Sequence, residues 1–151
     1  MSTKARIGYG SKVYMESAPF GAAALPVIGA MDKVGEVVDL SPPNKSKDAV
    51  EGTHMESEDA YREFLSGLKD GGEVTVTYNR VGDDAGQLTV QEGFEYDGAV
   101  WVFMDLPFAV PVRFAMKVIV TGVEEEVPLD DKMQGSFTGK VSGKPSLAPV
   151  V

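Results

Sequence analysis

The middle of the chain changes its hydrophobic period within a few residues. Between residues 58 and 69 the apolar side chains recur three and four positions apart, which on a helix forms a single stripe. This predicts a helix over residues 58–69 that packs on a sheet through Tyr61, Phe64, Leu65 and Leu68. From residue 73 the pattern alternates instead, which predicts a strand. Gly71 and Gly72 lie at the change, where they would end the helix in a tight joint.

Other segments have the short apolar patterns of strands bounded by turn residues. The ranges predicted as strands are 12–16, 27–40, 73–79, 99–106, 112–123 and 133–142. Within the second of these, Gly35 predicts a kink. Residues 85–98 fit either a strand or a short helix, because alternation at Leu88 and Val90 competes with a helical spacing.

Three segments carry little hydrophobic pattern. Residues 41–57 combine two prolines with polar and charged side chains, which predicts a long loop. Loops of about 15 residues are uncommon in compact domains unless they have a function. We expect residues 1–11 and 145–151 to form N-terminal and C-terminal arms of a single domain that spans residues 1–151.

This order of elements predicts the fold class. Sequential strands joined by short turns, with one amphipathic helix, describe a mainly β protein. We expect an antiparallel β-sandwich or partly open barrel that is flanked by the helix.

Composition excludes several classes of function. The chain of 151 residues has no cysteine, so disulfides, thiolate metal sites and a cysteine nucleophile are impossible. Its 14 Lys and Arg against 23 Asp and Glu give a formal charge of -9, which disfavours a phosphate-binding surface. No apolar segment approaches the roughly 20 residues that span a bilayer, so we expect no membrane contact.

Candidate chemistry is sparse. His54 is the single histidine, so neither a histidine metal site nor a charge relay is expected. The acidic clusters lack the spacing that wraps a calcium ion, and the glycines of residues 8–12 lack the flanking strand and helix of a phosphate loop. We therefore expect no enzymatic activity, no metal and no cofactor. The aromatic residues Trp101 and Phe103 fit a core, a ligand pocket or a subunit interface.

The ordered motifs resemble a known family. A glycine-rich start at residues 8–12 is followed by a bent strand, a polar loop and "FLSGLKDGGEV" at 64–74. Later come "VWVFMDLP" at 100–107, "VTGVEEEVPLDD" at 120–131 and "GKVSGKP" at 139–145. Together they resemble the major tail tube protein of bacteriophages with long non-contractile tails, over roughly residues 8–145.

The resemblance implies an architecture and an assembly. It implies two packed sheets with a flanking helix, in a barrel completed by neighbouring subunits of a hexameric ring. The rings would stack into a hollow tube through which viral DNA passes without specific binding. The implied partners are other copies of the chain, the tail tip or baseplate, the tail terminator and the tape measure protein. The implied location is the tail of the virion, after assembly in the cytoplasm of the bacterial host.

The resemblance also suggests roles for particular residues. An acidic channel would let DNA slide, because a cationic one would bind phosphates by releasing counterions. We expect Glu36, Asp39 and Glu73 to face that channel. The loop over residues 41–57 would contact other subunits and rings, and its candidate contact residues are Lys45, Lys47, Asp48, Glu51 and His54.

Two alternatives stay open at this stage. One is the tube protein of a contractile injection or secretion system, which has a similar sandwich and ring. The other is a small β-barrel that holds an apolar ligand near Trp101 and Phe103.

Overall fold

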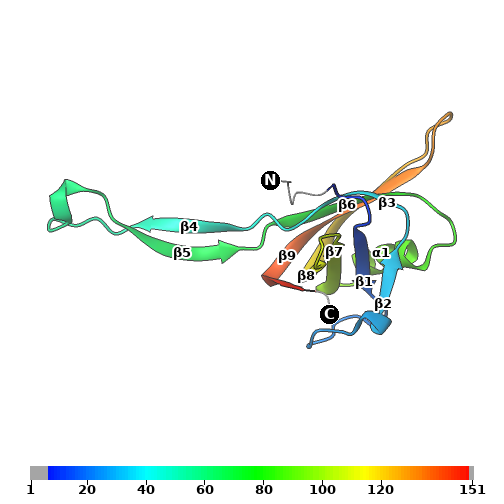
Figure 1. The fold of residues 1–151 in the computed structure, drawn as a ribbon, viewed down its shortest axis with the longest axis horizontal. Coiled ribbons are helices and arrows are strands. Elements are labelled where there is room, and N and C mark those ends of the chain that lie inside the picture. Colours follow the sequence, from blue (N-terminus) through cyan, green and yellow to red (C-terminus); the bar gives the residue numbers. More distant parts are fainter. Residues whose placement is uncertain (1–6, 150–151) are drawn as a thin grey trace.

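A computed structural model describes residues 7–149, which form one antiparallel sheet, a projecting two-stranded ribbon and a helix (Figure 1). The sheet consists of β1 (Lys12–Glu16), β2 (Met31–Val34), β3 (Val37–Ser41), β6 (Glu73–Asn79), β7 (Val100–Leu106), β8 (Val112–Glu126) and β9 (Gln134–Pro149). The ribbon consists of β4 (Ser46–Glu51) and β5 (Phe64–Asp70). The helix is α1 (Ala85–Glu95), and single 3-10 turns lie at Ile28–Ala30 and Glu58–Ala60.

The seven-stranded sheet curls until its two outer strands approach one another. Its strand order is β2-β1-β7-β8-β9-β6-β3, so the outer strands β2 and β3 are consecutive in the chain. Val34 ends β2 and Val37 begins β3, which limits their separation to about 11 Å. The prediction of a mainly β, partly open antiparallel barrel is therefore confirmed. The kink at Gly35 is confirmed too, because the chain turns there between the two strands.

The core fills the concave side of this sheet. Alternation in β6 buries Val74, Val76 and Tyr78 completely, as its sequence predicts. The other large members of the core come from β1, β7, β8 and β9, namely Val13, Met15, Val102, Met104, Met116, Val118 and Phe137. Every second residue of these strands therefore faces away from this core. On that side Phe103 of β7, Ala115 of β8 and Met31 of β2 form a second, smaller buried cluster.

Helix α1 closes one side of the core and settles the segment that the sequence left ambiguous. Gly86 and Gly93 lie on its buried face. A Cβ on Gly86 would overlap the carbonyl oxygen of Lys33 in β2, whereas one on Gly93 would lie 3.3 Å from Met15 Sδ, at the end of a flexible side chain. Glycine is needed at position 86 because the helix backbone approaches the sheet so closely. Asp84 caps the helix by accepting a hydrogen bond from Gln87 N at 3.0 Å.

The helix predicted over residues 58–69 is wrong. Residues 58–60 form a single 3-10 turn, and residues 64–70 form strand β5, which pairs with β4. The four side chains predicted to pack on a sheet are instead exposed, at Tyr61, Phe64, Leu65 and Leu68. Backbone pairing with residues 46–51 overrides the helical spacing of these apolar side chains.

Two further predictions about irregular segments need correction. The predicted loop over residues 41–57 contains strand β4, so it forms one half of a ribbon. The predicted C-terminal arm is ordered up to residue 149, because β9 continues to Pro149, which pairs with Val112 of β8. Of the predicted N-terminal arm, residues 1–6 lie outside the described residues. Residues 7–11 contain a turn in which Ser11 N donates to Gly8 O at 3.2 Å.

Candidate assembly surfaces

The ribbon of β4 and β5, with its connecting residues 52–63, forms an arm that projects far from the sheet (Figure 1). No residue of either strand is buried. The arm nevertheless carries large apolar side chains, since Val50 lies opposite Leu65 and both are more than half exposed. A two-stranded ribbon is only marginally stable in water by itself, and an apolar surface of this kind is typical of a contact site.

The tip of the arm is held by a compact set of hydrogen bonds. Glu63 Oε2 lies 3.3 Å from His54 Nε2 and accepts a hydrogen bond from Ser57 Oγ at 2.8 Å. Gly52 N donates to Glu63 O at 2.8 Å, and Glu63 N donates to Thr53 Oγ1 at 2.9 Å. Exposed ion pairs contribute little stability, so the backbone hydrogen bonds define this tip.

The residues predicted for subunit contacts are distributed along the arm. Lys47, Asp48 and Glu51 belong to β4, Lys45 directly precedes it, and His54 lies in the tip. The structure thus places all five on one projecting element without bringing them together in one cluster.

The base of the arm is tied to the sheet. Lys140 Nζ of β9 lies 2.8 Å from Asp70 Oδ1, and Gly72 N donates to the same oxygen at 2.8 Å. The Lys140 ammonium, followed by the Gly72 amide, lowers the pKa of Asp70 below its ordinary value. A depressed pKa means that this tie is present at neutral pH and is lost as the pH falls through the lowered value.

A polar face covers the outer side of β3, β6, β9 and the end of β8. Asp39 pairs with Thr77, Thr77 with Ser136, and Ser136 with Glu124, so one row of polar side chains crosses four strands. Glu73 extends the same face along β6, because residues two and four positions apart in a strand share a face. The structure thus brings Asp39 and Glu73 to one exposed face.

Two acidic residues of this face were missed by the sequence analysis. Glu124 and Glu126 lie in β8 beyond residue 123, where the sequence pattern predicts that this strand ends. Glu126 pairs with Gln134, which pairs with Asn79, in the next row of the same face. Alternation places Glu125 on the opposite side.

Glu36 occupies a different environment from Asp39 and Glu73. It lies in the joint between β2 and β3 with a φ of 54°, outside both strands. Its carbonyl oxygen accepts a hydrogen bond from Asn79 N at 2.9 Å. A positive φ is uncommon for a residue other than glycine, so the surroundings must hold this joint in place.

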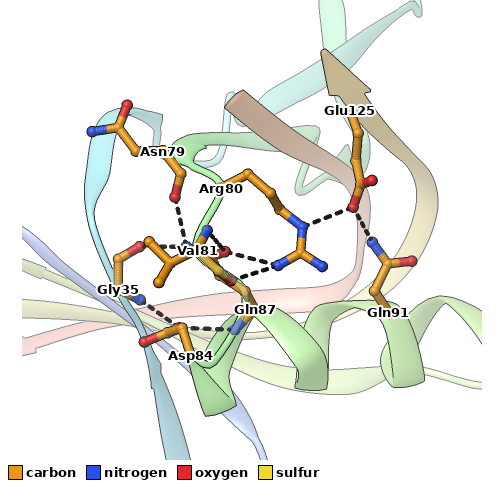
Figure 2. A network of polar contacts seen from close by, with 8 residues as sticks. All are labelled: Gly35, Asn79, Arg80, Val81, Asp84, Gln87, Gln91 and Glu125. Atoms are coloured by element: carbon orange, nitrogen blue, oxygen red, sulfur yellow. Dashed lines mark hydrogen bonds and ion pairs between the residues drawn. The ribbon is translucent and has the colours of Figure 1, made fainter. Parts of the chain in front are cut away.

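Figure 2 shows the polar network that holds the joint. Gln87 of α1 is completely buried, and its Nε2 donates to Gly35 O at 3.0 Å and to Asn79 O at 2.8 Å. Its Oε1 accepts from Val81 N at 2.8 Å and from Arg80 Nη1 at 3.1 Å. All four hydrogen-bonding positions of the Gln87 amide are therefore used.

The same network reaches the joint and the end of β8. Gly35 N donates to Asp84 Oδ2 at 3.0 Å, so the residue that caps α1 also binds the joint. Arg80 Nε and Gln91 Nε2 bind Glu125 Oε1 at 3.0 and 3.1 Å. Through one helix the network connects the joint between β2 and β3 with the end of β6 and the end of β8.

The outer face of β1, β7 and the start of β8 has a different chemistry. Arg113 binds Asp105 with both nitrogen–oxygen distances between 2.7 and 3.0 Å, and it lies over the ring of Phe103. The hydrogen bonds that Arg113 donates to the Asp105 carboxylate raise the pKa of Arg113. Trp101 Nε1 donates to Ala22 O at 2.9 Å, and Phe103 is buried. These aromatic residues pack within the protein, which argues against a ligand pocket at this position.

Two searches of residues 7–149 bear on other functions. No helix among them has the length and apolar character needed to cross a membrane. Nor do these residues gather three His, Asp or Glu side chains in one potential metal site.

Comparison with known proteins finds one matching family and several solved structures with a similar fold. The family model described as "Lambda phage tail tube protein, TTP" matches residues 14–148. No curated protein matches the sequence.

The tail of an empty gene transfer agent particle, refined with C6 symmetry, superposes with a TM-score of 0.68 at 12% identity, covering 95% of this chain and 99% of that one. The six-fold symmetrised anti-feeding prophage baseplate gives 0.67 at 9% identity, with coverages of 98% and 97%. The SPP1 tail tube gives 0.62 at 12% identity, with coverages of 96% and 80%. At such low identities these likenesses establish the fold.

Proposed function

Because the chain belongs to the lambda phage tail tube protein family, we propose that it polymerises as stacked hexameric rings into a hollow tail tube that delivers DNA. A member of this family is a structural protein of the phage tail and has no enzymatic role. The proposed ring of six follows the symmetry of the gene transfer agent tail and the anti-feeding prophage baseplate, which share this fold.

The observation that carries this proposal is the arm. It projects beyond the sheet, and its side chains Val50, Phe64, Leu65 and Leu68 are each more than half exposed. Apolar side chains on a ribbon of this length require another chain for their burial. In a self-assembling tube that chain is a second copy, so the arm joins one subunit or ring to the next.

We propose further that the polar face of β3, β6 and β9 lines the channel. Its acidic members are Asp39, Glu73, Glu124 and Glu126, and Glu36 at the nearby joint remains a candidate. Lys140 also lies on this face, but its ammonium is bound to Asp70. A surface of this charge repels phosphates, so DNA passes without being held.

Charge reversal tests the channel. Replacing Asp39, Glu73 and Glu124 by Lys should turn tubes that release DNA into tubes that retain it, because each new lysine adds a phosphate contact. We expect slower DNA ejection from particles, and binding of DNA to purified tubes that weakens steeply as salt rises.

The matched control reverses three acids on the side of the molecule that carries α1. Glu92, Glu95 and Asp97 are exposed there, and their replacement by Lys changes the net charge equally. We expect this control to eject DNA at the normal rate. Equal retention of DNA by both triple variants, with intact tubes, would refute an inward position for the polar face.

Electron microscopy of the purified chain tests assembly itself. As protein concentration rises, we expect single subunits to give way to rings and then to hollow rods, since assembly depends on mass action. Monomers at every concentration, each with an occupied ligand cavity, would instead support the small binding module.

The proposed partners beyond the chain itself are the tail tip or baseplate, the tail terminator and the tape measure protein, joined during assembly in the host cytoplasm. A contractile injection system remains the second candidate, because the anti-feeding prophage baseplate shares the fold as closely as the tail tubes do. The lambda family match favours the non-contractile tail. Tubes assembled inside a contractile sheath would favour the second candidate.

A further inference from the structure

Two lysines face each other across the arm. Lys47 of β4 and Lys69 of β5 are directly paired in the antiparallel register, and both are exposed. Neither forms an ion pair with any of residues 7–149. Like charges in directly opposite positions repel, so this position of the arm favours an anion supplied from outside the chain.

The acids nearest in sequence do not form ion pairs with these lysines. Asp70 is bound to Lys140 at the base of the arm. Asp48 follows Lys47 in β4, and alternation directs it to the opposite face of the ribbon. The register shifts by one residue between Lys47 and Ala49, and beyond the shift Ala49 pairs with Ser66 and Glu51 with the exposed Phe64. The face is therefore cationic at Lys47 and Lys69, and its outer part carries Ala49 and Phe64 beside Glu51.

A complementary surface lies in the turn between β8 and β9. These two strands extend past the sheet as a second, shorter projection, away from the arm (Figure 1). In its turn Leu129 is 103% exposed and Val127 is 72% exposed, so the fold itself buries neither. Asp130 and Asp131 follow, both exposed and without an ion pair in the part of the chain that the structure describes.

We propose that the β8–β9 turn of one copy seats on the arm of another copy. Asp130 and Asp131 supply the anions for Lys47 and Lys69, while Val127 and Leu129 pack on Phe64 and Ala49. The inference rests on the proposed self-assembly and adds to it the identity of the two contacting surfaces. The two surfaces carry opposite charges, and each also exposes apolar side chains. This complementarity makes the contact specific.

The position of the two surfaces suits a tube. They lie on different projections of one subunit, so their contact is heterologous and each copy keeps one free surface of each kind. A contact of this type does not end in a closed dimer, because it repeats around a ring or along an axis. Either form of repetition extends the assembly beyond two copies.

A charge exchange tests the contact in the full-length chain. One variant carries Lys47→Glu and Lys69→Glu, a second carries Asp130→Lys and Asp131→Lys, and a third carries all four changes. Each pair of changes replaces attraction by repulsion, so we expect the protein concentration needed for assembly to rise at least about tenfold. The fourfold variant restores attraction with reversed signs, and we expect it to assemble near the wild-type concentration.

Sedimentation and electron microscopy give the assembled fraction, and thermal unfolding checks that every variant is folded. Lys33→Glu with Lys144→Glu is the matched control away from the arm, and we expect it to assemble like the wild type. Wild-type assembly by both double variants, or failure of the fourfold variant to recover, overturns this contact alone. A wild-type chain that never assembles overturns the proposed function as well.

Discussion

Replacing residues 47–69 with a short Gly-Ser turn should leave the main sheet folded and abolish tube formation. The strands of the arm contain no buried residue, so their removal does not reduce the buried apolar surface of the core. Ser46 and Asp70 are directly paired, so the cut ends lie about 5 Å apart and a short turn can join them. We expect a change of about 1 kcal/mol or less in the free energy of unfolding.

The loss of assembly follows from what the arm exposes. Without it, the apolar side chains and paired lysines that meet another copy are gone, and the subunit loses its reach beyond the sheet. Sedimentation should show monomers at concentrations where the wild type forms rods, and circular dichroism should show an unchanged strand content. Normal rods from the armless variant would contradict the role of the arm.

The cut must remove both strands together. Deleting residues 43–54, which the sequence pattern marks as a loop, takes β4 and leaves β5 without a partner. An unpaired strand with exposed Phe64, Leu65 and Leu68 is an aggregation hazard. We therefore expect that shorter deletion to give aggregates, which would hide the loss of specific assembly.

Gln87→Leu should give the largest loss of stability from a single substitution in the polar network. Leucine fills a similar volume but leaves Gly35 O, Asn79 O and Val81 N without the partner that Gln87 supplies. Leaving a buried polar group unsatisfied costs about 1–3 kcal/mol, so we expect a loss of about 3–4 kcal/mol in all. Denaturant unfolding measures this directly.

A neighbouring glutamine provides the control. Gln91 lies one turn along α1, is half-buried and donates one hydrogen bond to Glu125 at 3.1 Å. Gln91→Leu should cost less than about 1 kcal/mol. Hydrogen exchange should also show faster opening of β3 in Gln87→Leu, because the joint at Glu36 loses its support. Equal effects of the two substitutions would mean that the network does not hold the joint.

The sequence predicts strands well where one face of the strand is buried. In β6, Val74, Val76 and Tyr78 alternate with threonines, and the structure buries all three. The same reasoning fails for the arm, because neither of its faces packs on the rest of residues 7–149. Without such packing, the spacing of its apolar side chains carries no information on the local backbone.

Helix α1 is hard to predict for the opposite reason. Its buried face consists of Gly86, Gln87, Thr89, Val90 and Gly93, which give little hydrophobic signal. Glycines bring the helix close to β2, and a glutamine supplies hydrogen bonds to the joint, so close approach and polar contacts replace an apolar stripe. Of the acids on the polar face, the sequence pattern singles out Asp39 and Glu73. Glu124 and Glu126 were missed because β8 extends beyond the apolar pattern.

A helical cryo-electron microscopy reconstruction of rods grown from the purified chain tests the central claim most directly. The account predicts a hollow tube whose lumen is lined by the outer face of β3, β6 and β9, with Asp39 and Glu73 toward the axis. It also predicts that every arm is buried against another copy. A lumen lined by α1 or by the face with Lys117 and Trp101, or arms left free in solvent, would contradict it.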